Sequence, residues 1–453
     1  MRKTHLLLFA LAAAIAAPLS TPAPKTRTDH VTETIHGVAI QDPYRWLEDQ
    51  QSPETRAWID SQNAYTRSVL DLLPDRAAIR KRLEELLKTD RVGTPSVRNG
   101  RYFFLRRLAD QNQYTVCLRN GLHGTDEMLI DPNRSGGDQT ASVVILDVSE
   151  DGKWLVYGTR QGGEDELAVT LLDVDAHKEL DHLPRARYEE LRITPDKQLF
   201  YYSKMLPEGS RIYRHPIGQN PASDEEIFGK GTGPTESVDV DLSIDGRYLG
   251  LYISHGWGKQ TEVYFKDLAG HGAIVPIVND VDAQFSPSFA GGRMFLETNW
   301  KAPHGRIFSV DLANPSREHW REVVPESASV IESYTAAGGK LAVNYLENVN
   351  SRVKICDANG KELREIAFPA LGTVTAIEGR WDSDEAFYTF TSFAQPGTGY
   401  RYEISSGKQD VWARPNVPID PTQFQVRQVW YPSKDKTRIP MFLVYKKGNN
   451  RLA

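Results

Sequence analysis

The sequence is poor in cysteine, with only Cys117 and Cys356 among its 453 residues, far apart in the chain. Neither lies in a Cys-x-x-Cys pair or a His-rich segment, so the spacing indicates neither zinc nor redox chemistry. The eleven histidines include no His-x-His or His-x-x-x-His pair. We therefore expect two isolated packing or surface thiols, no metal site and no cofactor.

The sequence also lacks a basic cluster and, beyond its N-terminus, a long apolar run. Lysine and arginine are scattered, and the formal net charge is −6. This pattern gives no basic surface field for nucleic acid or anionic lipid. No later segment approaches the roughly 20 apolar residues of a membrane span. The length is sufficient to bury a large core, and we expect one large domain or two.

Residues 1–24 are typical of a signal peptide followed by a spacer. Met1-Arg2-Lys3 is positively charged, the run from Leu6 to Ala17 is apolar, and small residues and prolines follow. The apolar run is too short to cross a bilayer comfortably. Removal of this segment would take away Arg2 and Lys3 and change the formal net charge from −6 to −8. We expect the mature protein to be periplasmic or extracellular.

Residues 29–90 form an N-terminal segment with helical character from Asp42 to Lys88. Ser52 is a candidate N-cap, with Pro53 at the first helical position. Pro74-Asp75 interrupts the pattern, and a second helix can run through Ile79, Leu83, Leu86 and Leu87 with its charges on the other face. The sequence therefore predicts two short helices here.

From residue 91 to residue 416 the apolar pattern alternates, and a tight turn followed by an aromatic or β-branched strand recurs seven times. The turns are Asn99-Gly100, Asp151-Gly152, Asp196-Lys197, Asp245-Gly246, Gly291-Gly292, Gly338-Gly339 and Asp384-Glu385. Their spacings are 52, 45, 49, 46, 47 and 46 residues. Four short strands fit each period, which is the size of one propeller blade. We predict an all-β fold, a seven-bladed β-propeller; two β-sandwiches with accidental spacing are the alternative.

Residues 417–453 lie outside the seven repeats. Gln423 to Lys446 contains two alternating stretches around Tyr431-Pro432-Ser433-Lys434-Asp435-Lys436-Thr437, which predicts a β-hairpin. A lone two-stranded hairpin is marginally stable and leaves strand edges unpaired. We therefore interpret this segment as a linker and the start of a further domain.

Two motifs give the chain a resemblance to a known family. Asp42-Pro43-Tyr44-Arg45-Trp46-Leu47-Glu48-Asp49 is similar to the N-terminal signature of the prolyl oligopeptidases. Ile439-Pro440-Met441-Phe442-Leu443-Val444-Tyr445-Lys446-Lys447-Gly448 resembles the segment that leads from the propeller of that family into its α/β-hydrolase domain. The resemblance covers roughly Asp29 to Gly448 and brackets the seven repeats. Oligopeptidase B has a related opening motif, but the Arg-Trp-Leu-Glu-Asp wording favours the prolyl enzymes.

The resemblance implies a two-domain serine peptidase in which the propeller restricts a Ser-Asp-His site to short peptides, cleaved after proline. Such chemistry needs a serine on a strained turn, an oriented histidine and an oxyanion hole. The sequence has no Gly-x-Ser-x-Gly, and the family places all three catalytic residues downstream of residue 453. We assign no catalytic residue and expect a chain truncated before its hydrolase half, with that half as its partner, and inactive alone.

Two other functions stay open. A stand-alone propeller would act as a binding or assembly module, because fold alone does not fix function. A different peptidase of the wider family, oligopeptidase B-like or dipeptidyl-type, would keep the architecture and lose the proline preference.

Two local segments are candidates for a binding site. The run Asp239 to Gly246 resembles a calcium loop, but Gly250 stands where an EF-hand needs glutamate, so strand alternation explains it better. The loop Ser254 to Lys259 follows the second strand of the fourth blade, where loops can face a partner domain or a peptide. His255 and Trp257 are our candidate peptide-contact residues; a Gly-rich hairpin turn is the alternative.

Overall fold

The computed structural model describes residues 22–134, 140–256, 258–270, 272–375 and 377–448. The chain divides into two compact units, residues 1–87 and residues 88–453, and each is described by itself. Residues 1–21, which carry most of the expected signal peptide, lie outside the described part. No helix in the described part is long and apolar enough to cross a membrane.

The N-terminal unit contains a hairpin and the two predicted helices. The hairpin pairs β1 (Thr32–Ile35) with β2 (Val38–Gln41), and η1 (Arg45–Glu48), α1 (Pro53–Leu70) and α2 (Arg76–Leu87) follow. Pro53 begins α1, as predicted, but the side chain of Ser52 makes no capping hydrogen bond. The hairpin was not predicted from the sequence. On α2, Ile79, Leu83 and Leu87 lie four residues apart and are exposed.

The signature Asp42 to Asp49 ties this unit together. The carboxylate of Asp42 accepts hydrogen bonds from Tyr44 N at 3.1 Å and Arg45 Nε at 2.6 Å. Arg45 also forms an ion pair with Glu33 of β1 at 2.8 Å. Trp46 packs edge-on against Trp58 of α1, with ring centroids 6.4 Å apart. The motif therefore joins the hairpin to the first helix and carries no reacting group.

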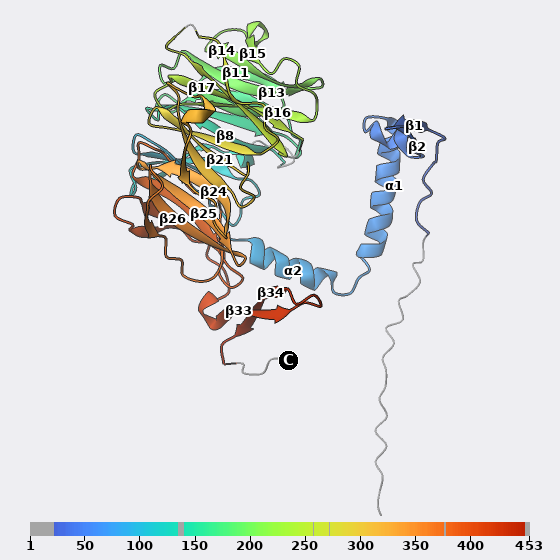
Figure 1. The fold of residues 1–453 in the computed structure, drawn as a ribbon. Helices are drawn as coiled ribbons and strands as arrows, with labels where there is room; N and C mark the ends of the chain where they lie inside the picture. Colours follow the sequence, from blue (N-terminus) through green and yellow to red (C-terminus); the bar gives the residue numbers. More distant parts are fainter. Residues whose placement is uncertain (1–21, 135–139, 257, 271, 376, 449–453) are drawn as a thin grey trace, which may run out of the picture. The chain divides into compact units, whose positions relative to one another are not determined.

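The second unit is a seven-bladed β-propeller (Figure 1), which confirms the prediction. Each blade is an antiparallel sheet whose strands follow one another in sequence from the inner to the outer edge. The first four blades are β3–β7 (Arg91–Val92, Ser96–Arg98, Arg101–Arg107, Thr115–Asn120, Asp126–Ile130), β8–β11 (Ser142–Val148, Trp154–Arg160, Leu167–Asp173, Lys178–Ala186), β12–β15 (Tyr188–Ile193, Leu199–Leu206, Gly209–Pro216, Glu225–Phe228) and β16–β19 (Glu236–Leu242, Tyr248–His255, Gln260–Asp267, Val275–Val278).

The last three blades are β20–β23 (Phe285–Ala290, Arg293–Thr298, Arg306–Asp311, Arg321–Val324), β24–β27 (Val330–Ala337, Lys340–Glu347, Asn350–Asp357, Glu362–Glu365) and β28–β32 (Thr373–Val374, Glu378–Gly379, Glu385–Thr391, Thr398–Glu403, Gln409–Ala413). In the first and seventh blades the inner strand is split into two short pieces, β3 with β4 and β28 with β29. Short 3-10 helices occur at Pro132–Arg134, Pro221–Ser223, Arg317–His319 and Pro421–Gln423.

The predicted turns join the inner strand of each blade to the second strand, and repeated side-chain chemistry forms several of them. Between β8 and β9 the hydroxyl of Ser149 donates to Asp151 Oδ1 at 2.7 Å, and the same carboxylate accepts Lys153 N at 3.0 Å. Between β16 and β17, Ser243 donates to Asp245 Oδ1 at 2.6 Å. Gly152 and Gly246 follow these aspartates with φ of 69° and 71°, a conformation that glycine adopts without strain.

A buried histidine links the second and third blades. His215 of β14 is fully buried, and its Nδ1 lies 2.7 Å from Asp224 Oδ1 while its Nε2 lies 3.0 Å from Asp181 Oδ2. Asp181 belongs to β11 of the second blade and also accepts Gly218 N at 2.5 Å. Tyr202 Oη donates to Asp224 Oδ2 at 2.9 Å. Carboxylate oxygens only accept, so the cluster is satisfied when both ring nitrogens carry hydrogen.

Side chains close the ring between the first and seventh blades. Among the described strands, none from one end of the propeller pairs into the blade at the other end. Trp412 of β32 instead donates its Nε1–H to the carbonyl of Gly93 at 2.9 Å and stacks on Tyr102 at 5.7 Å. The guanidinium of Arg119 lies 4.5 Å from the centre of the Trp412 ring, and Tyr102 Oη donates to Glu385 at 2.8 Å. We call this contact the seam.

The predicted hairpin follows the seventh blade. It pairs β33 (Phe424–Pro432) with β34 (Arg438–Lys446) in continuous antiparallel register. Phe442 packs against Phe393 at 5.1 Å between ring centroids, and Gln428 Nε2 donates to the carbonyl of Asn348 at 2.6 Å. Four large apolar side chains of the hairpin are exposed: Trp430, Tyr431, Met441 and Val444. That the hairpin begins another domain stays a prediction.

Candidate functional site

The main candidate site is a cavity of about 610 Å³ in the central channel of the propeller. All seven blades line it, each through its inner strand: Arg98 of β4, Asp147 of β8, Arg192 of β12, Asp241 of β16, Ser288 of β20, Ala336 of β24 and Glu378 of β29. Phe289 and Trp381 add aromatic wall on one side. A site of this kind depends on ring closure, because the residues come from across the propeller sequence.

Strand direction places this cavity at one end of the channel. The lining residues stand near the ends of the inner strands, beside the turns into the second strands. Successive strands of a blade are antiparallel. Because the inner strand ends at the mouth, the outer strand, fourth across the sheet, ends at the opposite end of the channel. There β32 ends and β3 begins. The chain therefore joins and leaves the ring at the end remote from the cavity. We call the cavity the channel mouth.

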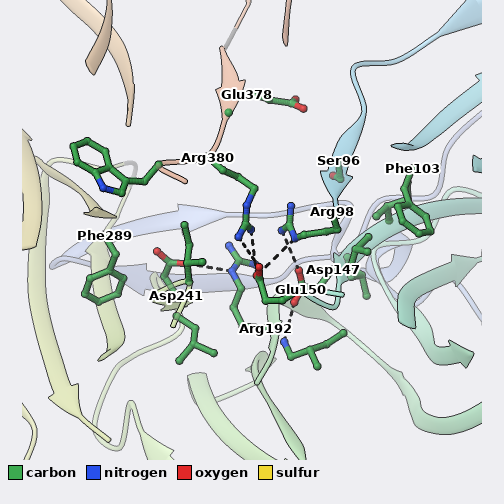
Figure 2. A pocket seen from close by; sticks show the side chains of 18 of the residues that line it. Ser96, Arg98, Phe103, Asp147, Glu150, Arg192, Asp241, Phe289, Glu378 and Arg380 are labelled. Atoms are coloured by element: carbon green, nitrogen blue, oxygen red, sulfur yellow. Dashed lines mark hydrogen bonds and ion pairs between the residues drawn. The ribbon is translucent and has the colours of Figure 1, made fainter. Parts of the chain in front are cut away.

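Two arginines converge on one glutamate at the mouth (Figure 2). Arg380 Nη1 and Nη2 donate to the two carboxylate oxygens of Glu150 at 3.2 and 2.5 Å. Arg98 Nε lies 3.7 Å from Glu150 Oε1, and Arg98 Nη2 lies 3.9 Å from Asp147 Oδ1. Burial lowers the pKa of Arg98, and the positive charge of Arg380 lowers it further. The Arg380–Glu150 ion pair joins the seventh blade to the second blade, which are separated in the ring by the first blade.

A second ion pair lines the same cavity. Arg192 Nε donates to Asp241 Oδ1 at 3.2 Å, and its Nη1 donates to Glu190 at 2.8 Å. Asp147 accepts Ile193 N at 2.8 Å, and burial raises the pKa of its carboxyl group. Burial also raises the pKa of Glu378, which points away from the arginines in Figure 2. Each of the three arginines therefore has at least one carboxylate oxygen within 4 Å, and that of Arg98 is the most distant.

Asp239 of β16 is the channel carboxylate with the clearest expected titration. Burial, followed by the negative charges of Glu189 and Glu190, raises its pKa to about 6 from an ordinary 3.8. The folded chain therefore holds this proton more tightly than the unfolded chain does. The contribution of Asp239 to the free energy of unfolding therefore falls as the pH rises from about 4 to about 6. Above that range the buried carboxylate is charged and destabilises the fold by its full amount.

We expect Asp239→Asn to raise the free energy of unfolding by about 2 kcal/mol at about pH 8 and to change it little at about pH 4. Urea denaturation at the two pH values measures the difference. The exposed Asp110 supplies the control: Asp110→Asn should shift neither value by more than about 0.5 kcal/mol. An equal gain from Asp239→Asn at both pH values would contradict the assignment.

The sequence-predicted contact residues lie elsewhere. His255 ends β17, at the opposite end of the channel from the mouth, with its ring between two glutamates. Its Nδ1 lies 3.1 Å from Glu236 Oε1 and its Nε2 lies 2.8 Å from Glu262 Oε1. The structure therefore does not bring His255 into the mouth, and its contact with peptide stays a prediction. Trp257 lies outside the described residues.

The other motifs have structural explanations. Both cysteines are buried and free, and burial raises the pKa of Cys356 to about 11. Along β16, which contains the start of the run Asp239 to Gly246, Val238 and Val240 are buried and alternate with Asp239 and Asp241, as the strand interpretation predicts. Within the described ranges, no group of three or more His, Cys, Asp or Glu residues is placed to hold a metal ion.

Comparison with known proteins identifies the architecture. Residues 24–415 match the family model described as prolyl oligopeptidase, N-terminal beta-propeller domain. The prolyl endopeptidase of Elizabethkingia meningoseptica is 29% identical over 94% of this chain, and prolyl oligopeptidase A of Galerina marginata is 26% identical over 94%. The chain spans 62% and 64% of the length of these two relatives.

Solved structures agree. A structure from an analysis of two prolyl endopeptidases superposes with a TM-score of 0.87 at 36% identity, over 94% of this chain and 65% of that one. Prolyl oligopeptidase B from Galerina marginata, at 23% identity and a TM-score of 0.82, shares the fold. The seven blades, their channel and the match across residues 24–415 lead to one conclusion: the chain belongs to the prolyl oligopeptidase family and carries its N-terminal β-propeller domain.

Proposed function

We propose that this chain is the propeller portion of a secreted serine peptidase that cleaves short peptides after proline, and that it controls peptide access while a hydrolase portion supplies the catalytic residues. The family match over residues 24–415 carries the proposal. Relatives of both bacterial and fungal origin that match over more than nine-tenths of this chain bear the names prolyl endopeptidase and prolyl oligopeptidase.

Exposed apolar side chains in each of the two units support a protein partner. The apolar stripe Ile79, Leu83 and Leu87 on α2 and the four exposed apolar side chains of the β33–β34 hairpin are unusual on surfaces that face only water. The strand edges of the hairpin are also available for pairing. These features support a protein partner, and a hydrolase portion joined through the hairpin would cover the apolar side chains and strand edges of that hairpin.

Complementation tests the proposal. The chain should be fused through its hairpin to the part of the Elizabethkingia meningoseptica enzyme that lies beyond the matched region. We expect the fusion to hydrolyse a blocked Gly-Pro p-nitroanilide at least about 100-fold faster than this chain alone, because the nucleophile comes with the added part. A serine-directed inhibitor should abolish the activity.

The substrate series separates the alternatives. Cleavage after lysine or arginine would replace the proline-specific proposal with an oligopeptidase B-like activity, and release of N-terminal dipeptides would indicate a dipeptidyl-type enzyme. Inhibitor-sensitive hydrolysis by this chain alone would refute the proposal that a separate hydrolase portion supplies the catalytic residues. The hydrolase part of the Elizabethkingia meningoseptica enzyme, tested without the propeller, is the control that shows whether the propeller limits the access of peptides.

Export is part of the proposal and rests on the residue pattern of positions 1–24. The mature chain should be recovered from the periplasm or medium with an N-terminus between Ala17 and Lys25, that is, after the apolar run. Edman sequencing of the exported protein measures this position, and a cytoplasmic chain that keeps Met1 would refute export.

A further inference from the structure

Arg98 is a cation with unused hydrogen-bond capacity inside the channel mouth. Its Nε is buried and makes no hydrogen bond within the described structure. Its Nη1 donates to the carbonyl of its neighbour Val97 at 3.0 Å, and its nearest carboxylate oxygens lie at 3.7 and 3.9 Å. Both carboxylate distances exceed a normal hydrogen bond. A guanidinium presents five donors in a planar fork that fits a carboxylate, so this residue is poised for a further acceptor.

Glu150 is the carboxylate that Arg98 and Arg380 share, and Arg98 also lies 3.9 Å from Asp147. Asp241 pairs with Arg192, and burial raises the pKa of Asp147 and Glu378 and so disfavours their charged forms. Arg380 Nε donates to Asp382 at 3.1 Å, on the outer side of the pair. Glu150 remains as the carboxylate between the two guanidinium groups, as Figure 2 shows.

Glu150 is a replaceable occupant of this position. It stands in the turn between β8 and β9, and its side chain is 34% exposed. Because the side chain already reaches solvent, a change of rotamer can carry the carboxylate out of the mouth without moving the strands. A carboxylate brought by a ligand would find the same donors, with Arg98 Nε in addition.

The walls beside the arginines suit a peptide end. Phe289 and Trp381 line the same cavity, together with Leu146 and Ile244. A small inorganic anion would leave this apolar wall uncovered, whereas the last residues of a peptide would cover it while their terminal carboxylate met the arginines. The cavity of about 610 Å³ is large enough for a few residues.

We propose that Arg98 and Arg380 at the channel mouth bind the free α-carboxylate of a short peptide, in the position that the Glu150 carboxylate holds in the peptide-free chain. This inference rests on the proposed function and adds a substrate feature to it: peptides with a free C-terminus bind the propeller itself. The site lies at the end of the channel remote from the point where the chain leaves the ring, so it acts in capture of the peptide and not in bond cleavage.

Equilibrium binding to this chain alone tests the proposal without any hydrolase portion. The probes are N-acetyl-Gly-Ala-Pro as the free acid and as its C-terminal amide, titrated while the tryptophan fluorescence of the chain and the heat of binding are followed. We expect the acid to bind at least about 10-fold more tightly than the amide, because only the acid supplies the charge that two arginines recognise. Equal affinities for acid and amide would overturn the proposal.

Three variants identify the residues. Arg380→Gln and Arg98→Gln should each remove most of the preference for the acid, while Glu150→Gln should strengthen acid binding by about 3-fold or more, since the internal competitor is lost. Arg352→Gln is the matched control, because Arg352 also pairs with two carboxylates, those of Glu347 and Glu365 at 2.7 and 2.6 Å, and belongs to β26 of the sixth blade, away from the mouth. It should leave the preference unchanged. Weaker acid binding by Glu150→Gln would overturn the replacement step.

Two further outcomes are decisive. Sodium sulfate that displaces the acid at an equal concentration would overturn the peptide assignment in favour of an inorganic anion site. Circular dichroism and the melting temperature of each variant show whether the ring is intact, and the acid–amide comparison on the unaltered chain needs no variant. A peptidase fusion that is active although this chain binds acid and amide equally would reject the inference and keep the proposed function.

Discussion

Replacing His215 with alanine is expected to lower the free energy of unfolding by about 3–5 kcal/mol, among the largest effects of any single change in the propeller. The histidine ring lies between Asp181 and Asp224, and all three side chains are at least nine-tenths buried. Alanine would take the imidazole partner from each of two buried carboxylates, leaving Tyr202 Oη on Asp224 and Gly218 N on Asp181, and burial of poorly compensated charge is costly. Urea denaturation followed by tryptophan fluorescence measures the loss.

The exposed His319 provides the control for the loss of an imidazole. His319→Ala should change the free energy of unfolding by less than about 0.5 kcal/mol. A triple variant should recover part of the lost free energy of unfolding: His215→Leu, Asp181→Asn and Asp224→Asn. It removes the two negative charges that His215→Ala leaves without their imidazole partner. If His215→Ala proves as harmless as His319→Ala, the cluster does not hold the second and third blades together.

Replacing Trp412 with alanine is expected to cost about 3 kcal/mol and to loosen the seam selectively. The indole ring stacks on Tyr102, accepts the guanidinium of Arg119 on its face and donates to the carbonyl of Gly93. No described strand crosses between the first and seventh blades, so these contacts have no backbone ladder to support them. Hydrogen exchange should therefore rise in β5 and β30, on the two sides of the seam.

Trp320 is a closely matched control. It is also partly buried, and its Nε1–H also donates to a backbone carbonyl, that of Pro315 at 3.0 Å. Its aromatic partners lie within the fifth blade: Phe285, Trp300 and Phe308. Trp320→Ala should raise exchange in the fifth blade and leave β5 and β30 protected. Equal protection of β5 and β30 in both variants would show that the seam does not depend on Trp412.

The propeller was predictable from the sequence because its signals are local. The hydrogen bonds that form the turns at Asp151 and Asp245 join residues only a few positions apart, and each following strand alternates in a way that is visible in a short window. The same holds for Pro53 at the start of α1. The β1–β2 hairpin was missed because its strands are four residues long and exposed, so no apolar alternation marks them.

The channel mouth was not predictable, because its residues meet only when the ring closes. Glu150 and Arg380 are 230 positions apart, and no local pattern relates them. A weak signal did exist: Arg98 and Glu150 each directly precede a predicted turn, and such residues end at the same mouth of a propeller. The Gly-rich loop that indicates His255 marks a turn but does not specify at which end of the channel the turn lies.

The continuity of each blade has a consequence for folding during synthesis. Every sheet, including the first and the last, is complete once about 50 consecutive residues have left the ribosome. Contacts between neighbours in sequence form early because short loops close at low entropic cost. Blades can thus be added one at a time from the N-terminus, and each new blade covers the exposed face of the one before it. A single slow event remains, the docking of Trp412 onto the first blade, and it waits until the seventh blade has been made.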